Sequence, residues 1–187
     1  AAVDDALTLA VTPHRGPVFL DVAMDHLFGS ADATISAPAP LAPSTPDPET
    51  LDAAARLIGA ARRPVLVVGG DVWAGGAERA ATDLAHELGL PVITNGMGRG
   101  VLGPRDPRLV TRARGAAFGK ADLVVVVGTP LDFRLGFGSF GPDGATPVVH
   151  VADHEEVLAR HVPLAAGVAG DLTLALDGLR ERLSRTG

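Results

Sequence analysis

Three short runs of mostly apolar residues constrain the fold of this 187-residue chain more than any other feature. They are PVLVVG at residues 64–69, LVVVVG at 123–128 and PVVHV at 147–151. A strand with one face in water alternates apolar and polar residues, whereas a continuous apolar run indicates a strand that is buried on both faces. The three runs therefore predict central strands of a parallel sheet that helices cover on each side.

Helical patterns separate these predicted strands. Asp47 and Pro48 are typical of a helix N-terminus, and apolar residues recur at helical spacing over 48–61, 77–88 and 172–183, the last after a capping Asp171. Shorter helices are predicted at 111–119 and 155–160, and further strands at 91–94 and 164–168, the last at an edge. This alternation predicts a doubly wound α/β domain with helices on both faces of its parallel sheet.

The first 47 residues follow a different pattern. Residues 31–47 contain prolines spaced among Ala, Ser and Thr, which predicts an extended linker. Before it, residues 17–22 are apolar except for Asp21 and begin at the Gly16-Pro17 turn, so one strand is predicted there. One strand cannot bury a core, and residues 1–30 are therefore predicted to be an arm or the tail of a preceding domain.

Composition excludes several classes of function. The chain has no cysteine, which removes disulfides, thiolate metal sites and cysteine nucleophiles. A net charge of −6, with Lys120 as the only lysine, argues against a nucleic-acid partner. No apolar run approaches the ~20 residues of a membrane span, and the first residues lack the pattern of a secretory signal. A soluble, cytoplasmic protein without a membrane partner is expected.

Glycines and polar residues follow the predicted strands, at the edge where ligands bind in such sheets. Gly69 and Gly70 follow the first strand, and Gly128 and Thr129 follow the 123–128 run. Glycines let a backbone approach a ligand, and the next helix offers N–H groups to an anion such as pyrophosphate. A mere tight turn explains the Gly69-Gly70 pair equally well. Beyond Thr129, Arg134 could hold phosphate or form an ion pair with a neighbouring carboxylate.

Other motifs at this edge are less specific. Asp153 could bind a ribose hydroxyl or cap the following helix. The histidines at 150, 154 and 161 could suggest a metal site, but a change from strand to helix separates them, and no metal site is predicted. A literal G-x-G-x-x-G at 136–141 lacks the strand and helix that give that motif its mechanism, so a loop is predicted. No catalytic constellation is present, which predicts a binding crevice without catalytic residues.

Several segments taken together resemble one known family. They are GPVFLDVAMD at 16–25, Gly69-Gly70, PVITNGMGRG at 91–100, ADLVVVVG at 121–128, LDFR at 131–134, VHVAD at 149–153 and Gly170-Asp171. In this order they are similar to the central domain of thiamine-diphosphate-dependent enzymes of the acetolactate synthase type, with oxalyl-CoA decarboxylase and 2-hydroxyacyl-CoA lyase as neighbours. The resemblance implies a sheet of about six strands. It also implies that residues 1–30 end a pyrimidine-binding domain, 31–47 are a linker and 48–187 are the central domain.

In several members of that family the central domain holds FAD or ADP. By resemblance, the residues that would line such a nucleotide site are Gly69, Gly70, Asn95, Gly96, Met97, Arg114, Gly115, Gly128, Thr129, Asp132, Arg134 and Asp153. Acetolactate synthases typically have Gly-Ala-Arg where this chain has Gly-Thr-Pro at 128–130, and this chain has one acid fewer at 150–153. FAD, an ADP-like or CoA-like nucleotide, and an empty site all stay open.

The motifs that bind thiamine diphosphate and Mg²⁺ in the family do not occur in these 187 residues. The resemblance thus implies a fragment that is not catalytic alone and that acquires both cofactors only in the intact, homo-oligomeric enzyme, with the missing domains as its partners. That enzyme would be a carboligase or lyase acting on 2-keto acids or acyl-CoA thioesters. The alternatives are an interaction module with a vestigial crevice and, less favoured, a free-standing NAD-dependent oxidoreductase.

Overall fold

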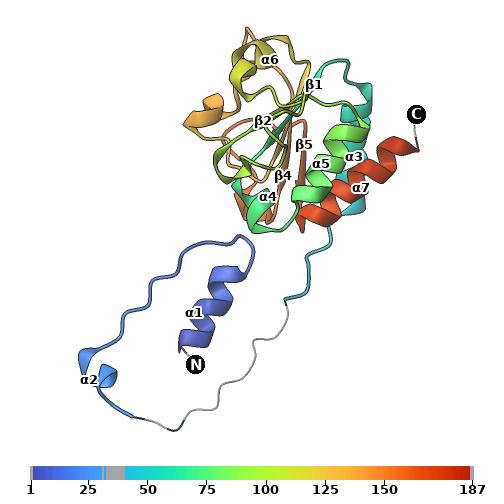
Figure 1. The fold of residues 1–187 in the computed structure, drawn as a ribbon. Coiled ribbons are helices and arrows are strands. Elements are labelled where there is room, and N and C mark those ends of the chain that lie inside the picture. The colour runs from blue at the N-terminus through green and yellow to red at the C-terminus, as the bar shows by residue number, and fades with distance from the viewer. Residues whose placement is uncertain (1, 31, 33–40, 186–187) are drawn as a thin grey trace. The chain divides into compact units, whose positions relative to one another are not determined.

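The computed structural model describes residues 2–30, 32 and 41–185. The chain divides into two compact units, Ala1–Ala42 and Pro43–Gly187, and the second unit holds the sheet (Figure 1). No helix among the described residues is both long enough and apolar enough to cross a membrane.

The sheet is parallel throughout, as the apolar runs predict. Its strands are β1 (Pro64–Val68), β2 (Val92–Thr94), β3 (Leu123–Val127), β4 (Val148–Ala152) and β5 (Ala166–Ala169). Their order is β2-β1-β3-β4-β5, so the described residues form five strands where the family resemblance implies about six. Since β2 lies on one side of β1 and all later strands lie on the other, the strand order reverses between β1 and β3. Ligands of such sheets bind at the carboxyl ends of the strands beside this switch point.

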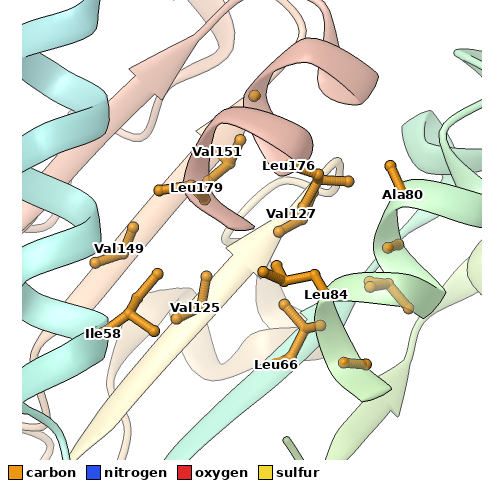
Figure 2. Packing of buried hydrophobic residues seen from close by; sticks show 14 of the residues in the cluster. Ile58, Leu66, Ala80, Leu84, Val125, Val127, Val149, Val151, Leu176 and Leu179 are labelled. Carbon is orange, nitrogen blue, oxygen red and sulfur yellow. The ribbon is translucent and has the colours of Figure 1, made fainter. Parts of the chain in front are cut away.

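Three helices cover one face of the sheet, namely α3 (Pro48–Ala60), α5 (Glu78–Glu87) and α7 (Leu172–Ser184) (Figure 1). Figure 2 shows Ile58, Leu84 and Leu179 of these helices lying over the valines and leucine of β1, β3 and β4. The labelled strand residues on this face include Leu66 and Val125, which are at most 1% exposed. The face therefore forms a continuous apolar core.

The opposite face is covered by α6 (Arg114–Lys120) and by irregular segments. Val67 and Val126 of the sheet belong to a cluster there with Leu131 and Phe140, which follow β3 in the chain. The rings of Phe118 on α6 and Phe140 lie 4.7 Å apart between centroids. Because both faces are buried, the strands lack polar alternation.

Local signals fix where the two longest helices begin. The Asp47 carboxylate accepts a hydrogen bond from the Thr50 N–H at 3.0 Å, with Pro48 in the first turn of α3. Asp171 accepts from the Leu174 N–H at 3.0 Å and begins α7 in the same way. Both predicted caps are confirmed, because a short acidic side chain satisfies an N–H that has no partner inside the helix.

The segment before α3 is held against the turn between β5 and α7. The Asp171 N–H donates to the Ser44 carbonyl at 2.7 Å. Gly170 has a φ of +143°, and a Cβ at that position would lie 2.9 Å from the Ser44 oxygen and from Pro46. The close approach therefore requires glycine.

At the amino edge of the sheet, one carboxylate joins the start of β1 to the start of β3. Asp122 accepts hydrogen bonds from the N–H groups of Arg62 and Arg63 at 2.9 and 2.8 Å. Burial raises the pKa of Asp122, but the two amides outweigh that effect and the net pKa lies below its usual value.

The first unit contains α1 (Ala2–Val11) and α2 (Met24–Leu27). The predicted strand at 17–22 is wrong, because these residues have no regular secondary structure and pair with no strand among the described residues. Of the predicted linker, 31 and 33–40 lie outside the described residues, and 41–47 are irregular. The predicted helix at 155–160 shortens to one 3₁₀ turn, η4 (Glu155–Val157), whereas 111–119 is confirmed as η2 (Thr111–Ala113) followed by α6.

Candidate functional site

The carboxyl ends of β1 and β3 meet at the switch point. The Gly69 N–H donates to the Val127 carbonyl at 2.9 Å, and the Asp71 N–H donates to the Gly128 carbonyl at 3.0 Å. Asp71 lies in the short helix α4 (Gly70–Ala74). These two amides at the end of β1 are therefore engaged by the protein itself.

Glycine is required here for close packing of the chain on itself. A Cβ at Gly69 would overlap the Gly128 carbonyl and the Thr129 side chain, whose Cγ2 would lie 2.9 Å away. Gly128 has a φ of +60°, and a Cβ there would lie 2.9 Å from the Val72 nitrogen. The glycines that follow the strands thus let β1 and β3 end side by side.

The segment after β2 closes the same cluster. Asn95 precedes the short turn η1 (Gly96–Gly98), donates its N–H to the Val68 carbonyl at 2.8 Å, and reaches the Thr129 hydroxyl through its side-chain amide at 3.2 Å. A Cβ on Gly70 would lie 3.5 Å from the Cβ of Met97, which is ordinary contact. The structure therefore brings together seven predicted residues, called here the strand-end cluster: Gly69, Gly70, Asn95, Gly96, Met97, Gly128 and Thr129.

A second group, called here the arginine cluster, consists of Arg114, Gly115, Asp132 and Arg134. The Arg134 Nε lies 3.0 Å and its Nη2 2.5 Å from the Asp132 Oδ2, so the predicted alternative of an ion pair is the one found. The hydrogen bond from Arg134 holds the pKa of Asp132 below its usual range, and the pKa of Arg134 rises in turn. Much of the Arg134 guanidinium is therefore occupied.

Arg114 has a different environment. Its Nη2 donates to the Arg134 carbonyl, and its guanidinium carbon lies 5.7 Å from the centroid of the Phe118 ring. With Gly115 it lines a cavity of about 310 Å³, whose far wall includes Gly136 and Gly141. The G-x-G-x-x-G segment begins in the last residues of the kinked 3₁₀ helix η3 (Phe133–Gly138) and continues as the predicted loop, and it forms part of the cavity wall.

The sequence suggests only a metal-ligand role for His150, but in the structure this side chain forms hydrogen bonds with backbone groups. It is 1% exposed, its Nε2 lies 3.1 Å from the Thr129 carbonyl, and its Nδ1 accepts the Ala159 N–H at 3.1 Å. An Nδ1 that accepts a hydrogen bond carries no proton, so Nε2 is the donor to Thr129. Burial lowers the pKa of His150 and favours this neutral form.

The two other candidate metal ligands are also bonded to backbone groups. The Nε2 of His161 lies 3.0 Å from the Leu131 carbonyl, and the Nδ1 of His154 accepts the Glu156 N–H at 3.3 Å. His154 is the cap of η4. The alternative role predicted for Asp153, capping the following helix, belongs instead to its neighbour His154. Asp153 itself is buried directly after β4.

Comparison with known proteins identifies the family of this domain. Residues 51–179 match the family model described as thiamine pyrophosphate enzyme, central domain. The chain belongs to this family. The chain is 46% identical over 185 residues to the acetolactate synthase large subunit of Mycobacterium tuberculosis, covering 95% of this chain and 33% of that protein. It is 23% identical to oxalyl-CoA decarboxylase of Escherichia coli, covering 98% of this chain and 34% of that protein.

A solved structure agrees with the fold of the central domain. The crystal structure of benzoylformate decarboxylase from Polynucleobacter necessarius superposes with a TM-score of 0.74 at 22% identity, covering 97% of this chain and 36% of that one. This chain therefore spans about a third of the length of the relatives that it matches.

Within this central domain the predicted site residues form two clusters and one separate residue. The Thr94 N–H donates to the Thr111 hydroxyl at 3.0 Å, which places the start of the η2 and α6 segment beside the end of β2. The strand-end and arginine clusters thus both belong to the carboxyl edge, and Asp153 follows the neighbouring strand β4. The signal that could have found His150 is its position as the only polar residue inside an apolar strand.

Proposed function

We propose that this chain is the central domain of an acetolactate synthase that joins 2-keto acids. The observation that carries the proposal is the 46% identity, over 95% of the chain, to an acetolactate synthase large subunit. The match to oxalyl-CoA decarboxylase has half that identity. In the intact enzyme, thiamine diphosphate supplies the carbanion chemistry. Domains outside these residues would hold it with Mg²⁺, while this domain provides the scaffold.

The second part of the proposal is that the carboxyl edge binds the adenosine diphosphate group common to ADP and FAD. Arg114 is the cation best suited to the diphosphate, because it has no carboxylate partner among the described residues, unlike Arg134. Gly115 beside it leaves open space, since nothing lies within 4 Å of a Cβ placed there. Asp153 is the candidate for a ribose hydroxyl.

A vestigial crevice is the alternative that a specific observation favours. The N–H groups of Gly69 and Asp71 donate hydrogen bonds to the carbonyls of Val127 and Gly128. The turn after β1 therefore has fewer N–H groups left for a pyrophosphate than a helix N-terminus offers. On this alternative the domain acts only in packing against other domains or subunits.

Calorimetric titration of the chain with ADP, FAD and CoA separates these possibilities. We expect ADP to bind and Arg114→Gln to weaken it, while Arg105→Gln, an exposed arginine outside the cluster, serves as the matched control. Silence for all three ligands would favour the interaction module. Binding that the Arg114 variant leaves unchanged would contradict the assignment of the arginine cluster.

The activity requires the whole gene product. We expect the full-length protein, given thiamine diphosphate and Mg²⁺, to form acetolactate from pyruvate and to run as a homo-oligomer in light scattering, and we expect it to be cytoplasmic. Turnover of oxalyl-CoA without formation of acetolactate would assign it to the lyase branch instead.

A further inference from the structure

A cavity of about 510 Å³ lies at the amino edge of the sheet, at the opposite strand ends from the proposed nucleotide site. Its wall includes Pro64 at the start of β1, Pro91 just before β2, and the α6 helix. Val65 and Leu90 in the wall are only 3% and 4% exposed, so the cavity reaches the core. Its volume falls within the ~300–1,000 Å³ of pockets for small ligands.

The charges around this cavity are opposite to those of the chain as a whole. The chain has 22 acidic and 16 basic residues, but the residues lining the cavity include three cations and no carboxylate. These cations are Arg62, Arg63 and Lys120, all exposed. The Asp122 carboxylate accepts hydrogen bonds from the backbone N–H groups of Arg62 and Arg63, which fixes the turn, and it also attracts the charge of Arg63. Both exposed arginines line the cavity.

Apart from these cations, the wall of the cavity is apolar. It is formed by Pro, Val, Leu, Ala and Gly residues, among them Leu88 after α5 and Ala117 on α6. A ligand that fits must therefore bury an apolar body and leave an anionic group at the rim, where arginine and lysine can contact it. Lys120 also lies in the last turn of α6, where a cation is favourable without any ligand. The experiment must separate these two roles.

We propose that this amino-edge cavity binds a small amphiphilic anion, a carboxylate or sulfonate with an apolar body of one or two rings or a short acyl chain. The body lies over Val65 and Leu90, and the anionic group is held by Arg63 and Lys120. The size of the cavity favours such a molecule over a protein segment, and the absence of acidic lining residues favours an anion over a neutral ligand.

Two fluorescent probes with the same rings test this proposal on the 187-residue chain. Anilinonaphthalene sulfonate carries an anionic group, and phenylnaphthylamine is the same ring system without it. We expect the double variant Arg63→Gln/Lys120→Gln to weaken the sulfonate about tenfold and the neutral probe less than about twofold. Arg99→Gln removes an exposed cation elsewhere and should change neither.

A steric variant tests the location. Ala116 is exposed on α6 and lines the cavity, so Ala116→Phe should block both probes without disturbing the core. Ala74→Phe adds the same ring at an exposed position outside the cavity and is the matched control. Amide NMR shifts on addition of the sulfonate should centre on Leu90, Ala117 and Lys120.

Three results would overturn the proposal. Shifts centred on the exposed Phe19 and Phe28 would mean adventitious binding to the first unit. Equal loss of both probes in the double cation variant would mean that the cations serve only the protein. No binding of either probe to the folded chain would show that this cavity is not a site for such ligands.

Discussion

Replacing Gly98 with alanine should separate η1 from the end of β1. A Cβ at this position would lie 2.5 Å from the Val68 oxygen and 2.9 Å from the Gly69 oxygen. A carbon and a carbonyl oxygen normally approach no closer than about 3.3 Å. The new methyl group would therefore overlap the Val68 oxygen by roughly 0.8 Å, and the atoms that it meets are backbone atoms that cannot rotate away.

The overlap can be relieved only if η1 moves away from β1. That movement stretches the hydrogen bond from the Asn95 N–H to the Val68 carbonyl, now 2.8 Å, and disturbs the one from the Gly98 N–H to the Asn95 carbonyl, now 2.9 Å. Overpacking and the weakened hydrogen bonds together should lower the free energy of unfolding by about 2–4 kcal/mol. For a domain of this size the melting temperature should fall by about 10 °C.

Urea unfolding followed by circular dichroism measures this change, with the m-value checked for constancy. Gly115→Ala is the matched control, because a Cβ on that α6 glycine meets nothing within 4 Å. We expect that control to be neutral or to stabilise by about 0.5 kcal/mol, since alanine restricts the unfolded chain. If the two variants shift the urea midpoint equally, the close approach of η1 to β1 is not a constraint on the fold.

Three further predictions concern the core, the buried histidine and the arginine cluster. Leu176→Ala removes a fully buried side chain and should cost about 2–5 kcal/mol in thermal unfolding, whereas Leu174→Ala, 40% exposed, should cost less than about 1 kcal/mol. Burial lowers the pKa of His150, so the unfolded chain binds a proton more readily than the folded chain below pH 6.5. The free energy of unfolding should therefore fall as the pH drops below that value. Urea unfolding at a series of pH values should show a shallower pH dependence in His150→Gln than in the unchanged protein. Asp132→Asn releases Arg134 and should tighten ADP binding roughly threefold in calorimetry; weaker binding would mean that Asp132 itself contacts the ligand.

The fold of the second unit follows from local features of its sequence. The run at 123–128 corresponds to β3 (Leu123–Val127), because five successive apolar side chains are stable only between two covered faces. Asp47 and Asp171 give the helix starts to the residue, since capping depends on a few neighbouring atoms. The strand predicted at 17–22 failed because a strand depends on a partner, and the described residues provide none.

The candidate site was less predictable than the fold. The sequence shows which residues follow the strands. It does not show whether Gly69 faces a ligand or packs on Thr129, because that depends on how two segments 60 residues apart in the chain meet. The sequence allows Arg134 either to bind phosphate or to pair with a carboxylate. It does not distinguish the two, because the ion pair with Asp132 depends on the backbone of η3 (Phe133–Gly138). His150 was missed for the same reason, since its partners come from loops after β3 and β4.

The contact between Ser44 and Asp171 determines how a mechanical load would reach this domain. Tension applied to the chain on the N-terminal side of Ser44 would pass into the turn between β5 and α7 through that hydrogen bond and the packing of Pro46 on Gly170, before it reached α3. In a pulling experiment, the first rupture should therefore free residues 43–47 and leave the sheet intact. Displacement of the segment before Ser44 would therefore act first on the edge of the sheet at β5 and only afterwards on α3.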